Sequence, residues 1–591
     1  MIESRATSVV LTMFEPSARG LRRLVAVLSV TIAVLSFNVI SITAANADAY
    51  WTNAIEIPGL ATLNQTAAAP GPIVCTSSGN CVSGGGLTDS SLNEQAFLAQ
   101  ETNGVWSSAT VVAGALNVGG VALVTAISCP AVGSCTAVGF YGDNAATKHT
   151  FVISQVNGTW GFPTEVPDFT TLLTDDANVM NALSCTSNTT CVGVGTYLDH
   201  ATSISQPIIF TETNGVWAAP VEALGAASSN PGGLTLVGAL DCTSATSCTA
   251  AGDFFNLSPP NVFLAPFLIE EMNGVWGGVE AVPGVAALTR VLDIGLTSLS
   301  CGATGDCTAG GIYGDAAGQL QAFIVNEVGG VWGNASQLFA TQTLGSGLSN
   351  SLNGIECPSA GDCTAIGEFA DVQGNAQPFV VDETNHSWSP AIEVPGVQSL
   401  NNSAGATLTT ISCSAVGNCS AGGTYTDANT DTQAFLVNDS NGSWSDPIEI
   451  PGTSSLNKGG VSAVSEVSCS GDGSCGVQGT YTDASTNTQL FVVNSSAIAP
   501  TSVSSAPRHV TALDKKGEIT VRWSVPVSNG GTAITSYTVV SLPKSKTCTT
   551  QATSCTFKGL NKKLHYSFEV RATNADGSSV LSTKSNVVRD N

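Results

Sequence analysis

The stretch ATLTTISCSAVGNCSAGGTYTDANTDTQAFLVNDSNGSWSDPIEIPG, residues 406–452, is one copy of a unit that recurs along most of this chain. It divides into four runs separated by turn residues: ATLTTISC, CSAGGTY, QAFLVN and a fourth run that holds Trp444. Asn441-Gly442 stands between the third and fourth runs, and Asn-Gly between apolar runs is a strong short-range signal for a β-hairpin. The unit is therefore predicted to form four short antiparallel strands.

Two cysteines separated by five residues mark each copy. Eight such pairs occur, and successive first cysteines are 54, 56, 57, 59, 56, 56 and 56 residues apart. Self-similarity at a nearly fixed period is the signature of a repeat architecture. The pairs are Cys75/Cys81, Cys129/Cys135, Cys185/Cys191, Cys242/Cys248, Cys301/Cys307, Cys357/Cys363, Cys413/Cys419 and Cys469/Cys475, and a ninth close pair, Cys548/Cys555, follows near the C-terminus.

All 18 cysteines therefore have a close partner, which predicts nine local disulfides in an exported chain. A zinc site is the alternative interpretation of paired cysteines. It is disfavoured because zinc sites favour two to four intervening residues and a second ligand pair. The chain also has only five histidines.

The two ends of the repeat region predict how the units are arranged. The segment Tyr50–Pro58, with Trp51, is a lone fourth strand, whereas the last unit stops after its third strand, QLFVVN. We expect the N-terminal strand to complete the last unit and close a ring without open edges. A β-solenoid, the alternative, needs caps instead. The predicted fold class is all-β: an eight-bladed β-propeller with four-stranded blades, the N-terminal strand closing the last blade, followed by a C-terminal β-sandwich.

The turn and tryptophan of several units read E-T-N-G-V-W, as at residues 101–106 and 212–217. This pattern resembles a degenerate Asp-box, the hairpin motif of sialidase-like and related secreted bacterial β-propellers, without its serine and aspartate. The resemblance implies a fold and says little about chemistry.

The first residues have the composition of an export signal. Arg19, Arg22 and Arg23 precede the apolar run Leu24–Ile42, which is followed by Ala45-Asn46-Ala47. A basic region, an apolar region and a small-x-small site describe a secretory signal. The apolar run is also long enough to span a bilayer, so an uncleaved membrane anchor is the alternative. Residues 1–47 are predicted to be one or the other, and the remaining chain to be secreted or extracellular.

The C-terminal region differs in sequence from the repeats 48–495. After a linker, 496–506, the stretch 506–540 resembles the first half of a fibronectin type III domain, with Trp523 and Tyr537 as the aromatic residues of two adjacent core strands. Leu560 and Tyr566 match the tyrosine-corner region of that family. The resemblance, assigned to residues 507–591, implies a spacer or adhesive module of the kind often found beside polysaccharide-degrading units.

Charge divides the chain in the same way. Tyr50–Ser495 has 36 acidic residues against Lys148, Arg290 and Lys458, a net charge of −33. Arg508–Asn591 has 12 basic against five acidic residues, a net of +7. The acidic region should repel nucleic acid, so no nucleic-acid partner is expected. A surface that only confers solubility is the alternative meaning of this charge.

Residues that recur in every unit are first interpreted as packing residues. A glycine four residues after the second cysteine is attributed to close backbone approach near the axis, and the recurring Trp and Phe to packing between units. An aspartate recurs eight residues after the second cysteine. It predicts either an Asx turn or, alternatively, a ring of calcium sites. No other cofactor is expected. The candidate metal ligands are Asp143, Asp199, Asp315, Asp427 and Asp483.

Several kinds of active site are excluded by composition. A sialidase site needs an arginine cluster, but Arg290 is the only arginine between Tyr50 and Ser495. No G-x-S-x-G elbow of a serine hydrolase and no phosphate-binding glycine loop occurs in the sequence. A carboxylate pair for glycoside hydrolysis stays open, because two acids can meet across a ring. The recurring glutamates of the fourth run are interpreted as structural.

A specific ligand site is expected where the repeat is broken. The fourth unit has an inserted segment, Ser229–Gly233, and an extended loop between its second and third strands. We expect an apolar, aromatic-rimmed patch there, with a self-packed loop as the alternative. Its candidate residues are Phe254, Phe255, Pro259, Pro260 and Arg290.

The predicted function is non-catalytic binding at or near the cell surface by a monomeric protein. The expected partner is an extracellular polysaccharide or a surface protein. The alternative is an extracellular polysaccharide-degrading enzyme, a glycosidase or lyase, that uses an unrecognised carboxylate pair.

Overall fold

The computed structural model describes residues 50–591, apart from 145–146, 168–176, 200–203, 230–232, 257–262, 289–293, 339–343, 345–348, 402–403, 497–502, 516, 527–533, 544, 575–576 and 590–591. The predicted signal or anchor, 1–47, lies outside the described residues. No helix within the described part of the chain is long and apolar enough to cross a membrane.

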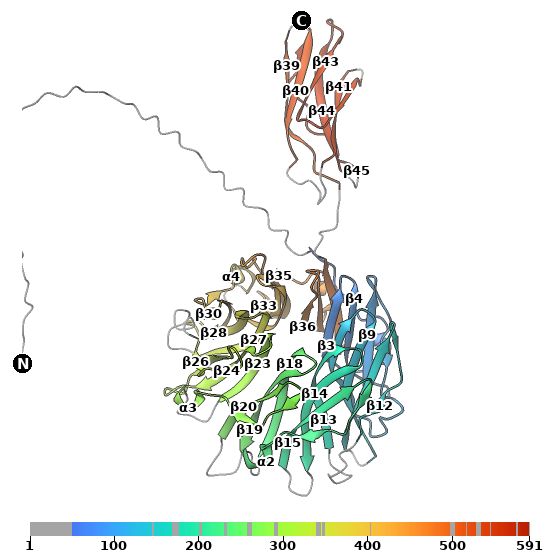
Figure 1. Cartoon of the computed structure of the whole chain (residues 1–591). Helices are drawn as coiled ribbons and strands as arrows, with labels where there is room; N and C mark the ends of the chain where they lie inside the picture. Colours follow the sequence, from blue (N-terminus) through green and yellow to red (C-terminus); the bar gives the residue numbers. More distant parts are fainter. Residues whose placement is uncertain are drawn as a thin grey trace, which may run out of the picture. The chain divides into compact units, whose positions relative to one another are not determined.

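Each repeat forms one antiparallel sheet, numbered here in chain order (Figure 1). Sheet 1 contains β3 (Ala68–Ser77), β4 (Asn80–Thr88), β5 (Glu94–Thr102), β6 (Val105–Trp106) and β7 (Thr110–Val111). Sheet 2 contains β8 (Ala122–Ala131), β9 (Ser134–Gly142), β10 (Lys148–Val156), β11 (Thr159–Trp160) and β12 (Thr164–Glu165). Sheet 3 contains β13 (Ala177–Ser187), β14 (Thr190–Asp199), β15 (Ile204–Thr213), β16 (Val216–Trp217) and β17 (Val221–Glu222). Sheet 4 contains β18 (Leu234–Ser244), β19 (Ser247–Asn256), β20 (Phe263–Met272), β21 (Val275–Trp276) and β22 (Glu280–Ala281).

The second half of the repeats continues this order. Sheet 5 contains β23 (Ile294–Ala303), β24 (Asp306–Gly314), β25 (Leu320–Asn326) and β26 (Ser336–Gln337). Sheet 6 contains β27 (Asn350–Ser359), β28 (Asp362–Ala370), β29 (Ala376–Thr384), β30 (Ser387–Trp388) and β31 (Ile392–Glu393). Sheet 7 contains β32 (Ala406–Ala415), β33 (Asn418–Thr426), β34 (Thr432–Asn438) and β35 (Ile448–Glu449). Sheet 8 contains β36 (Ser462–Cys469), β37 (Cys475–Thr482) and β38 (Thr488–Ser496), together with β1 (Tyr50–Trp51) and β2 (Ile55–Glu56).

Short helices of one turn follow the last strand of five sheets. They are α1 (Leu60–Leu63), α2 (Ala226–Ser229), α3 (Val285–Leu288), α4 (Val397–Asn401) and α5 (Thr453–Leu456).

The predicted disulfides and hairpin turns are confirmed. Cys413 and Cys419 are direct cross-strand partners on β32 and β33. Eight of the nine disulfides join the first two strands of a repeat. The ninth joins Cys548 to Cys555. Asn441 and Gly442 have φ of 54° and 75°, the positive values that a tight hairpin turn requires.

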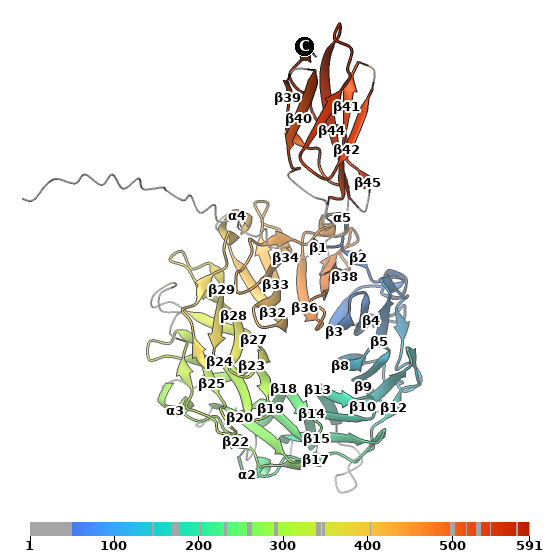
Figure 2. The ribbon, with the colours of Figure 1, turned by 45° about the horizontal axis from the view of Figure 1, so that its top comes forward.

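Consecutive sheets are neighbours through their first strands, and β36 of sheet 8 packs against β3 of sheet 1 (Figure 2). Polar side chains cross each boundary. The backbone N–H of Cys469 donates to Ser412 Oγ at 3.0 Å, and Thr409 Oγ1 donates to the carbonyl of Val464 at 3.3 Å. Such bonds satisfy backbone groups that the bulged first strand leaves without a ladder partner.

The predicted fold class requires correction. The repeats were expected to be the four-stranded blades of an eight-bladed β-propeller, but six of the eight sheets have five strands. The fourth run is divided because the chain after the turn leaves the ladder, so that β6 pairs with one end of β5 and β7 with its middle. Among the described residues the sheets are separate and form no closed barrel. The chain is all-β, built from small, disulfide-bearing, repeated sheets and a C-terminal sandwich.

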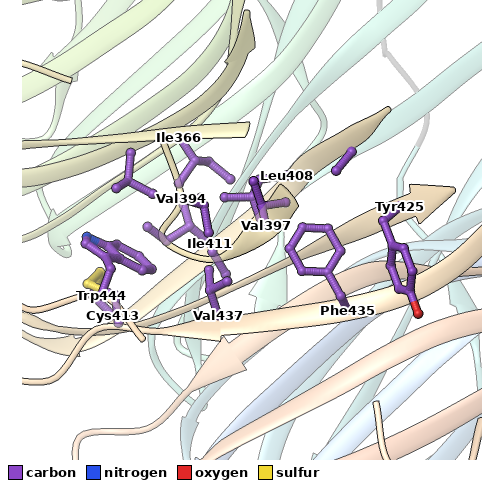
Figure 3. Packing of buried hydrophobic residues seen from close by; sticks show 14 residues of the cluster. Ile366, Val394, Val397, Leu408, Ile411, Cys413, Tyr425, Phe435, Val437 and Trp444 are labelled. Atoms are coloured by element: carbon purple, nitrogen blue, oxygen red, sulfur yellow. A yellow bond between two sulfur atoms is a disulfide. The ribbon is translucent and has the colours of Figure 1, made fainter. Parts of the chain in front are cut away.

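The apolar core lies between neighbouring sheets. Figure 3 shows the cluster at the boundary of sheets 6 and 7, where Ile366 and Val394 of sheet 6 meet Leu408, Phe435 and other residues of sheet 7. The recurring phenylalanines are fully buried, which confirms their predicted packing role. They are Phe97, Phe151, Phe267, Phe323, Phe379, Phe435 and Phe491.

The recurring glycine is explained by the first strand of its own sheet rather than by a neighbouring unit near the axis. A Cβ on Gly423 would lie 1.8 Å from the carbonyl oxygen of Thr407 on β32. Gly423 is also the cross-strand partner of Phe435. The three atoms nearest to the added Cβ belong to the backbone of Thr407 and Leu408, so the backbone occupies the space of a side chain.

The C-terminal sandwich pairs β39 (Arg508–Asp514), β40 (Glu518–Ser524) and β43 (Ser554–Lys558) in one sheet. The other contains β41 (Ser536–Leu542), β42 (Thr547–Thr550), β44 (His565–Asn574), β45 (Gly577–Ser578) and β46 (Val588–Arg589). Trp523 and Tyr537 are buried with ring centroids 5.4 Å apart. The hydroxyl of Tyr566 accepts a hydrogen bond from the backbone N–H of Asn561 at 3.0 Å, as expected for a tyrosine corner.

Candidate binding site: a carboxylate groove between neighbouring sheets

The predicted ligand patch of the fourth repeat is described only in part. Phe254 is 3% exposed and stacks on Phe267, with ring centroids 4.3 Å apart, and Phe255 is half-buried. Pro259, Pro260 and Arg290 lie outside the described residues. The expectation for Phe254 is therefore corrected: its side chain contributes to the core at the boundary with sheet 3. A ligand site at the remainder of this loop stays a prediction.

Two of the predicted disulfide cysteines, Cys191 and Cys363, belong to the core. They are 1% and 4% exposed and pack among the apolar residues of sheets 3 and 6. Cys191 Sγ lies 3.9 Å from Thr136 Oγ1, and Cys363 Sγ lies 3.5 Å from Thr308 Oγ1, each on the preceding sheet. Both were predicted as disulfide cysteines, and the disulfides Cys185–Cys191 and Cys357–Cys363 confirm this.

The recurring aspartates bind backbone groups of their own turns. Asp315 Oδ1 accepts hydrogen bonds from the backbone N–H groups of Ala317 and Gln319 at 2.8 and 2.9 Å. Asp427 and Asp483 make the same pair of bonds, and Asp143 accepts from Thr147. The side chain of Asp199 lies outside the described residues. This is the Asx-turn geometry. Across the described ranges, no group of three or more His, Cys, Asp or Glu side chains is placed to hold a metal ion.

The recurring glutamates also have structural partners. The hydroxyl of Tyr197 donates to Glu222 at 3.0 Å, that of Tyr425 to Glu449 at 3.3 Å, and that of Tyr481 to Glu56 at 2.9 Å. These glutamates thus tie the last strand of a sheet to its second strand.

A different set of acids meets at the boundary between sheets 4 and 5. We use the name carboxylate groove for the cavity of about 200 Å³ that Asp241, Glu270, Glu271 and Glu327 line. Asp241 precedes Cys242 on β18, the two adjacent glutamates lie near the end of β20, and Glu327 follows β25. Among the described residues that line the groove there is no lysine, arginine or histidine.

Burial changes the pKa values of three of these carboxyl groups. Burial, together with the charges of Glu270 and Asp306, raises the pKa of Glu327 to about 7. Burial also raises the pKa of Glu271 and of Asp241, although Asp241 accepts the backbone N–H of Cys301 at 2.8 Å. Each group therefore favours a ligand or proton that removes its negative charge.

Glu271 occupies the position that Glu101, Glu212 and Glu383 have in other sheets, and the buried Oε2 atom of each of the four has no hydrogen-bond partner. The side chain of Glu271 is 6% exposed. A buried carboxylate oxygen without a donor is costly, so an external donor entering the groove would stabilise it.

At the boundary of sheets 1 and 2, the neutral Gln100 and Gln155 occupy the positions of Glu270 and Glu327, while Glu101 occupies that of Glu271. A cavity of about 230 Å³ lies at the same place there, and Gln155 Nε2 donates to Gln100 Oε1 at 2.7 Å. Glu270 and Glu327 occupy the equivalent positions between sheets 4 and 5. Two like charges thus replace a hydrogen-bonded amide pair.

The boundary of sheets 6 and 7 also has acids at these two positions, Asp382 and Asp439. Asp382 accepts a hydrogen bond from the hydroxyl of Thr364 at 2.9 Å, and burial raises the pKa of Asp439 to about 7. Glu356 and Glu383 of sheet 6 occupy the positions of Asp241 and Glu271, so both boundaries have acids at all four positions. Between sheets 4 and 5 the four carboxyl groups line one cavity.

These acids were not among the residues predicted from the sequence. The signal was present, because the residue before the first cysteine is serine in five units but Asp241 in the fourth. The pairing of Glu270 with Glu327 was not visible, because they are 57 positions apart and meet only when sheets 4 and 5 pack together.

Comparison with known proteins identifies the C-terminal region. Residues 505–588 match the fibronectin type III domain family. This part of the chain is a fibronectin type III domain. Such a domain, together with many disulfides, is typical of extracellular proteins and suggests an adhesive module. No curated protein matches the chain.

Similar solved structures cover either a small part or somewhat more than half of this chain. Titin kinase with its flanking domains is 28% identical over 15% of this chain and 17% of that chain, with a TM-score of 0.14, so the chain spans less than a fifth of that relative. A protein of unknown function from Dyadobacter fermentans is 8% identical over 56% and 98%, with a TM-score of 0.32. A subtype N11 neuraminidase-like protein of a flat-faced bat influenza virus is 12% identical over 57% and 97%, with a TM-score of 0.30. At these TM-scores none of the three likenesses informs on fold or function.

Proposed function

We propose that this chain is an extracellular, non-catalytic binding protein whose carboxylate groove binds a cationic group of its partner. The observation that supports this most directly is the pair Glu270 and Glu327, two acids where another boundary has a bonded amide pair. An ammonium or guanidinium group between them would replace repulsion by two charge-assisted hydrogen bonds.

A neighbouring cavity of about 160 Å³ suits the apolar part of such a group. Glu270 and Met272 line both cavities, and Leu268, Val275 and Trp332 line the second. Lysine and arginine side chains lay their alkyl stems on apolar surface while the charged end is solvated or paired, and they also stack on tryptophan. The partner that fits is therefore a surface protein or polymer that presents basic side chains or amines.

The test uses an acetylated tri-arginine amide, a probe with three guanidinium groups and no carboxylate. Binding is measured by calorimetry near 0.15 M salt, which screens the general acidity of the repeats. We expect Glu270→Gln to weaken binding about tenfold, because one charge-assisted interaction is lost.

A matched control separates the groove from net charge. Glu94→Gln removes the same charge from an exposed position on β5 of sheet 1, and binding should stay as in the unmodified chain. Equal losses in both variants would attribute binding to the overall acidity and overturn the proposed site.

The alternative, a polysaccharide-degrading enzyme, has one observation in its favour. Glycoside hydrolysis uses one protonated and one ionised carboxyl group, and burial raises the pKa of Glu327 to about 7 beside Glu270. Release of soluble sugar from polysaccharides that is lost in Glu327→Gln would support this alternative. Retention of ligand without product supports the binding function.

A further inference from the structure

We infer that sheet 6 carries a second, independent binding site, one for a neutral, hydroxyl-rich ligand such as a sugar unit of a glycan, in the cavity beside Phe369 and Glu393. This cavity of about 480 Å³ is lined by Phe369, Asp371, Val372, Gln373, Gln377, Glu393 and Gln398. Its volume falls within the ~300–1,000 Å³ of small-molecule sites.

A pair of positions recurs in every sheet of the repeats. One is the sixth residue after the second cysteine, and the other is the fifth residue after the tryptophan. Three sheets join them by the Tyr–Glu hydrogen bonds described above. The remaining pairs, from sheets 1, 2, 4, 5 and 6, are Leu87/Val111, Tyr141/Glu165, Phe254/Ala281, Tyr313/Gln337 and Phe369/Glu393.

Sheet 6 is the exception in this series. Elsewhere an apolar residue at the first position has an apolar partner, and a tyrosine has a polar partner. Phe369 combines an apolar ring with the acidic Glu393, so the carboxylate has lost its hydroxyl donor. Phe369 is 6% exposed and packs in the core, which places the missing hydroxyl at the wall of the cavity.

The groups around Glu393 suit a ligand with several hydroxyls. Gln398 Nε2 donates to Glu393 Oε1 at 3.2 Å, which orients the carboxylate. The amide of Gln373 also lines the cavity and has both a donor and an acceptor. Neighbouring sugar hydroxyls can donate to a carboxylate and accept from an amide at the same time, and the exposed Val372 offers apolar contact to a sugar ring.

The other acid of the cavity is occupied by its own turn. Asp371 Oδ1 accepts the backbone N–H groups of Gln373 and Asn375, both at 2.8 Å, and Oδ2 accepts from the side chains of Asn375 and Gln377. Glu393 is therefore the carboxylate that meets the ligand. Because the repeats carry a net charge of −33 from Tyr50 to Ser495, a neutral sugar fits better than an anionic one.

The test restores the residue that the other sheets have. Phe369→Tyr places a hydroxyl within reach of Glu393 and fills the proposed position of the ligand hydroxyl, while the fold gains a hydrogen bond. The probes are the hexasaccharides of the cello-, malto-, chito- and manno- series, with binding to the full chain measured by calorimetry. We expect at least one series to bind, and Phe369→Tyr to weaken it about tenfold or more.

Three controls keep the outcome interpretable. Glu393→Gln should also weaken binding, because an amide donor replaces one carboxylate oxygen, whereas Tyr425→Phe in sheet 7 should leave binding at sheet 6 unchanged. Glu270→Gln should not affect the sugar, which separates this site from the carboxylate groove. Unchanged binding in Phe369→Tyr, or no binding of any of the four series, would overturn the inference.

Discussion

The indole nitrogen of Trp332 donates a hydrogen bond to Glu270 Oε1 across the boundary between sheets 5 and 4. At the next boundary Trp388 makes the corresponding bond to Asn326 Oδ1 at 3.5 Å. These two tryptophans thus reach the preceding sheet, whereas the buried indole nitrogens of Trp51, Trp160, Trp217, Trp276 and Trp444 have no hydrogen-bond partner. In sheet 5 its acceptor is an acid, so the bond is charge-assisted and holds Glu270 at the edge of the carboxylate groove.

Replacing Trp332 by Phe should therefore lower the free energy of unfolding more than the same change at Trp388. Both variants keep an aromatic ring, but Trp332→Phe deprives a carboxylate of its donor, which we expect to cost about 1–3 kcal/mol. Trp388→Phe deprives only a neutral amide. Chemical denaturation of the two variants measures the difference, and equal losses would contradict the stronger bond at Trp332.

Stability should fall as pH rises from about 5 to 8, the range bounded by the ordinary and the raised pKa values of the buried acids. Burial raises the pKa of Glu101, Asp253, Asp439 and Glu466 to about 7, and that of Glu356 to about 8. Because the folded protein holds these protons more tightly than the unfolded chain, their contribution is complete below the ordinary pKa. It is lost as pH passes through the raised values.

The turn aspartates set the lower end of the pH range in which the protein is most stable. Asp89 and Asp483 have lowered pKa values because side-chain and backbone donors stabilise their charged form, so their contribution is lost as pH falls below 3.8, their ordinary value. Thermal unfolding should give a Tm higher at pH 5 than at pH 8 by on the order of 5 °C. A Tm that rises steadily from pH 5 to 8 would contradict the prediction that the buried acids lower stability over this range.

Glu356→Gln should stabilise the repeats at pH 8 and change little at pH 5. Burial is the largest cause of the raised pKa of Glu356, and the charges of Asp241 and Glu466 also raise it. Removing the charge should therefore raise the free energy of unfolding by on the order of 1 kcal/mol or more at pH 8. The exposed Glu280 provides the control, since Glu280→Gln should have no such pH-dependent effect. Denaturation at both pH values tests the prediction, which fails if Glu356→Gln destabilises at pH 8.

Gly423→Ala should be severely destabilising, on the order of 3–5 kcal/mol or enough to prevent folding. The added Cβ would meet the Thr407 carbonyl at 1.8 Å, and the ring of Phe435 packs across the same strand pair. Gly442 is the control, because nothing lies within 4 Å of its Cβ position and only its φ of 75° opposes alanine. Gly442→Ala should lower the free energy of unfolding by about 1–2 kcal/mol. Urea denaturation compares the two variants.

Local features were predictable because they depend on neighbouring residues. Cys413 and Cys419 are close enough in sequence that one hairpin brings them together, and Asn441-Gly442 needs only its own turn to adopt positive φ. The fibronectin type III domain was recognised from Trp523 and Tyr566 for the same reason, since each belongs to a short pattern. The division of the fourth run was not predictable. Trp106 and Thr110 pair with residues of β5 that are not adjacent, and the number of strands per sheet was therefore wrong.

The sequence by itself determined the repeat, its cysteine pairs, its hairpins and its acidity, because these follow from spacing and composition. Only the tertiary structure decided which acids meet. Glu270 lies beside Glu327 because two sheets pack side by side, and Glu393 lacks a hydroxyl donor because two strands of one sheet place Phe369 beside it. The repeated pattern assigns these residues equivalent positions but not their neighbours. The physical reason is that a carboxyl group's hydrogen-bond donors and burial come from chain segments that only folding brings to it.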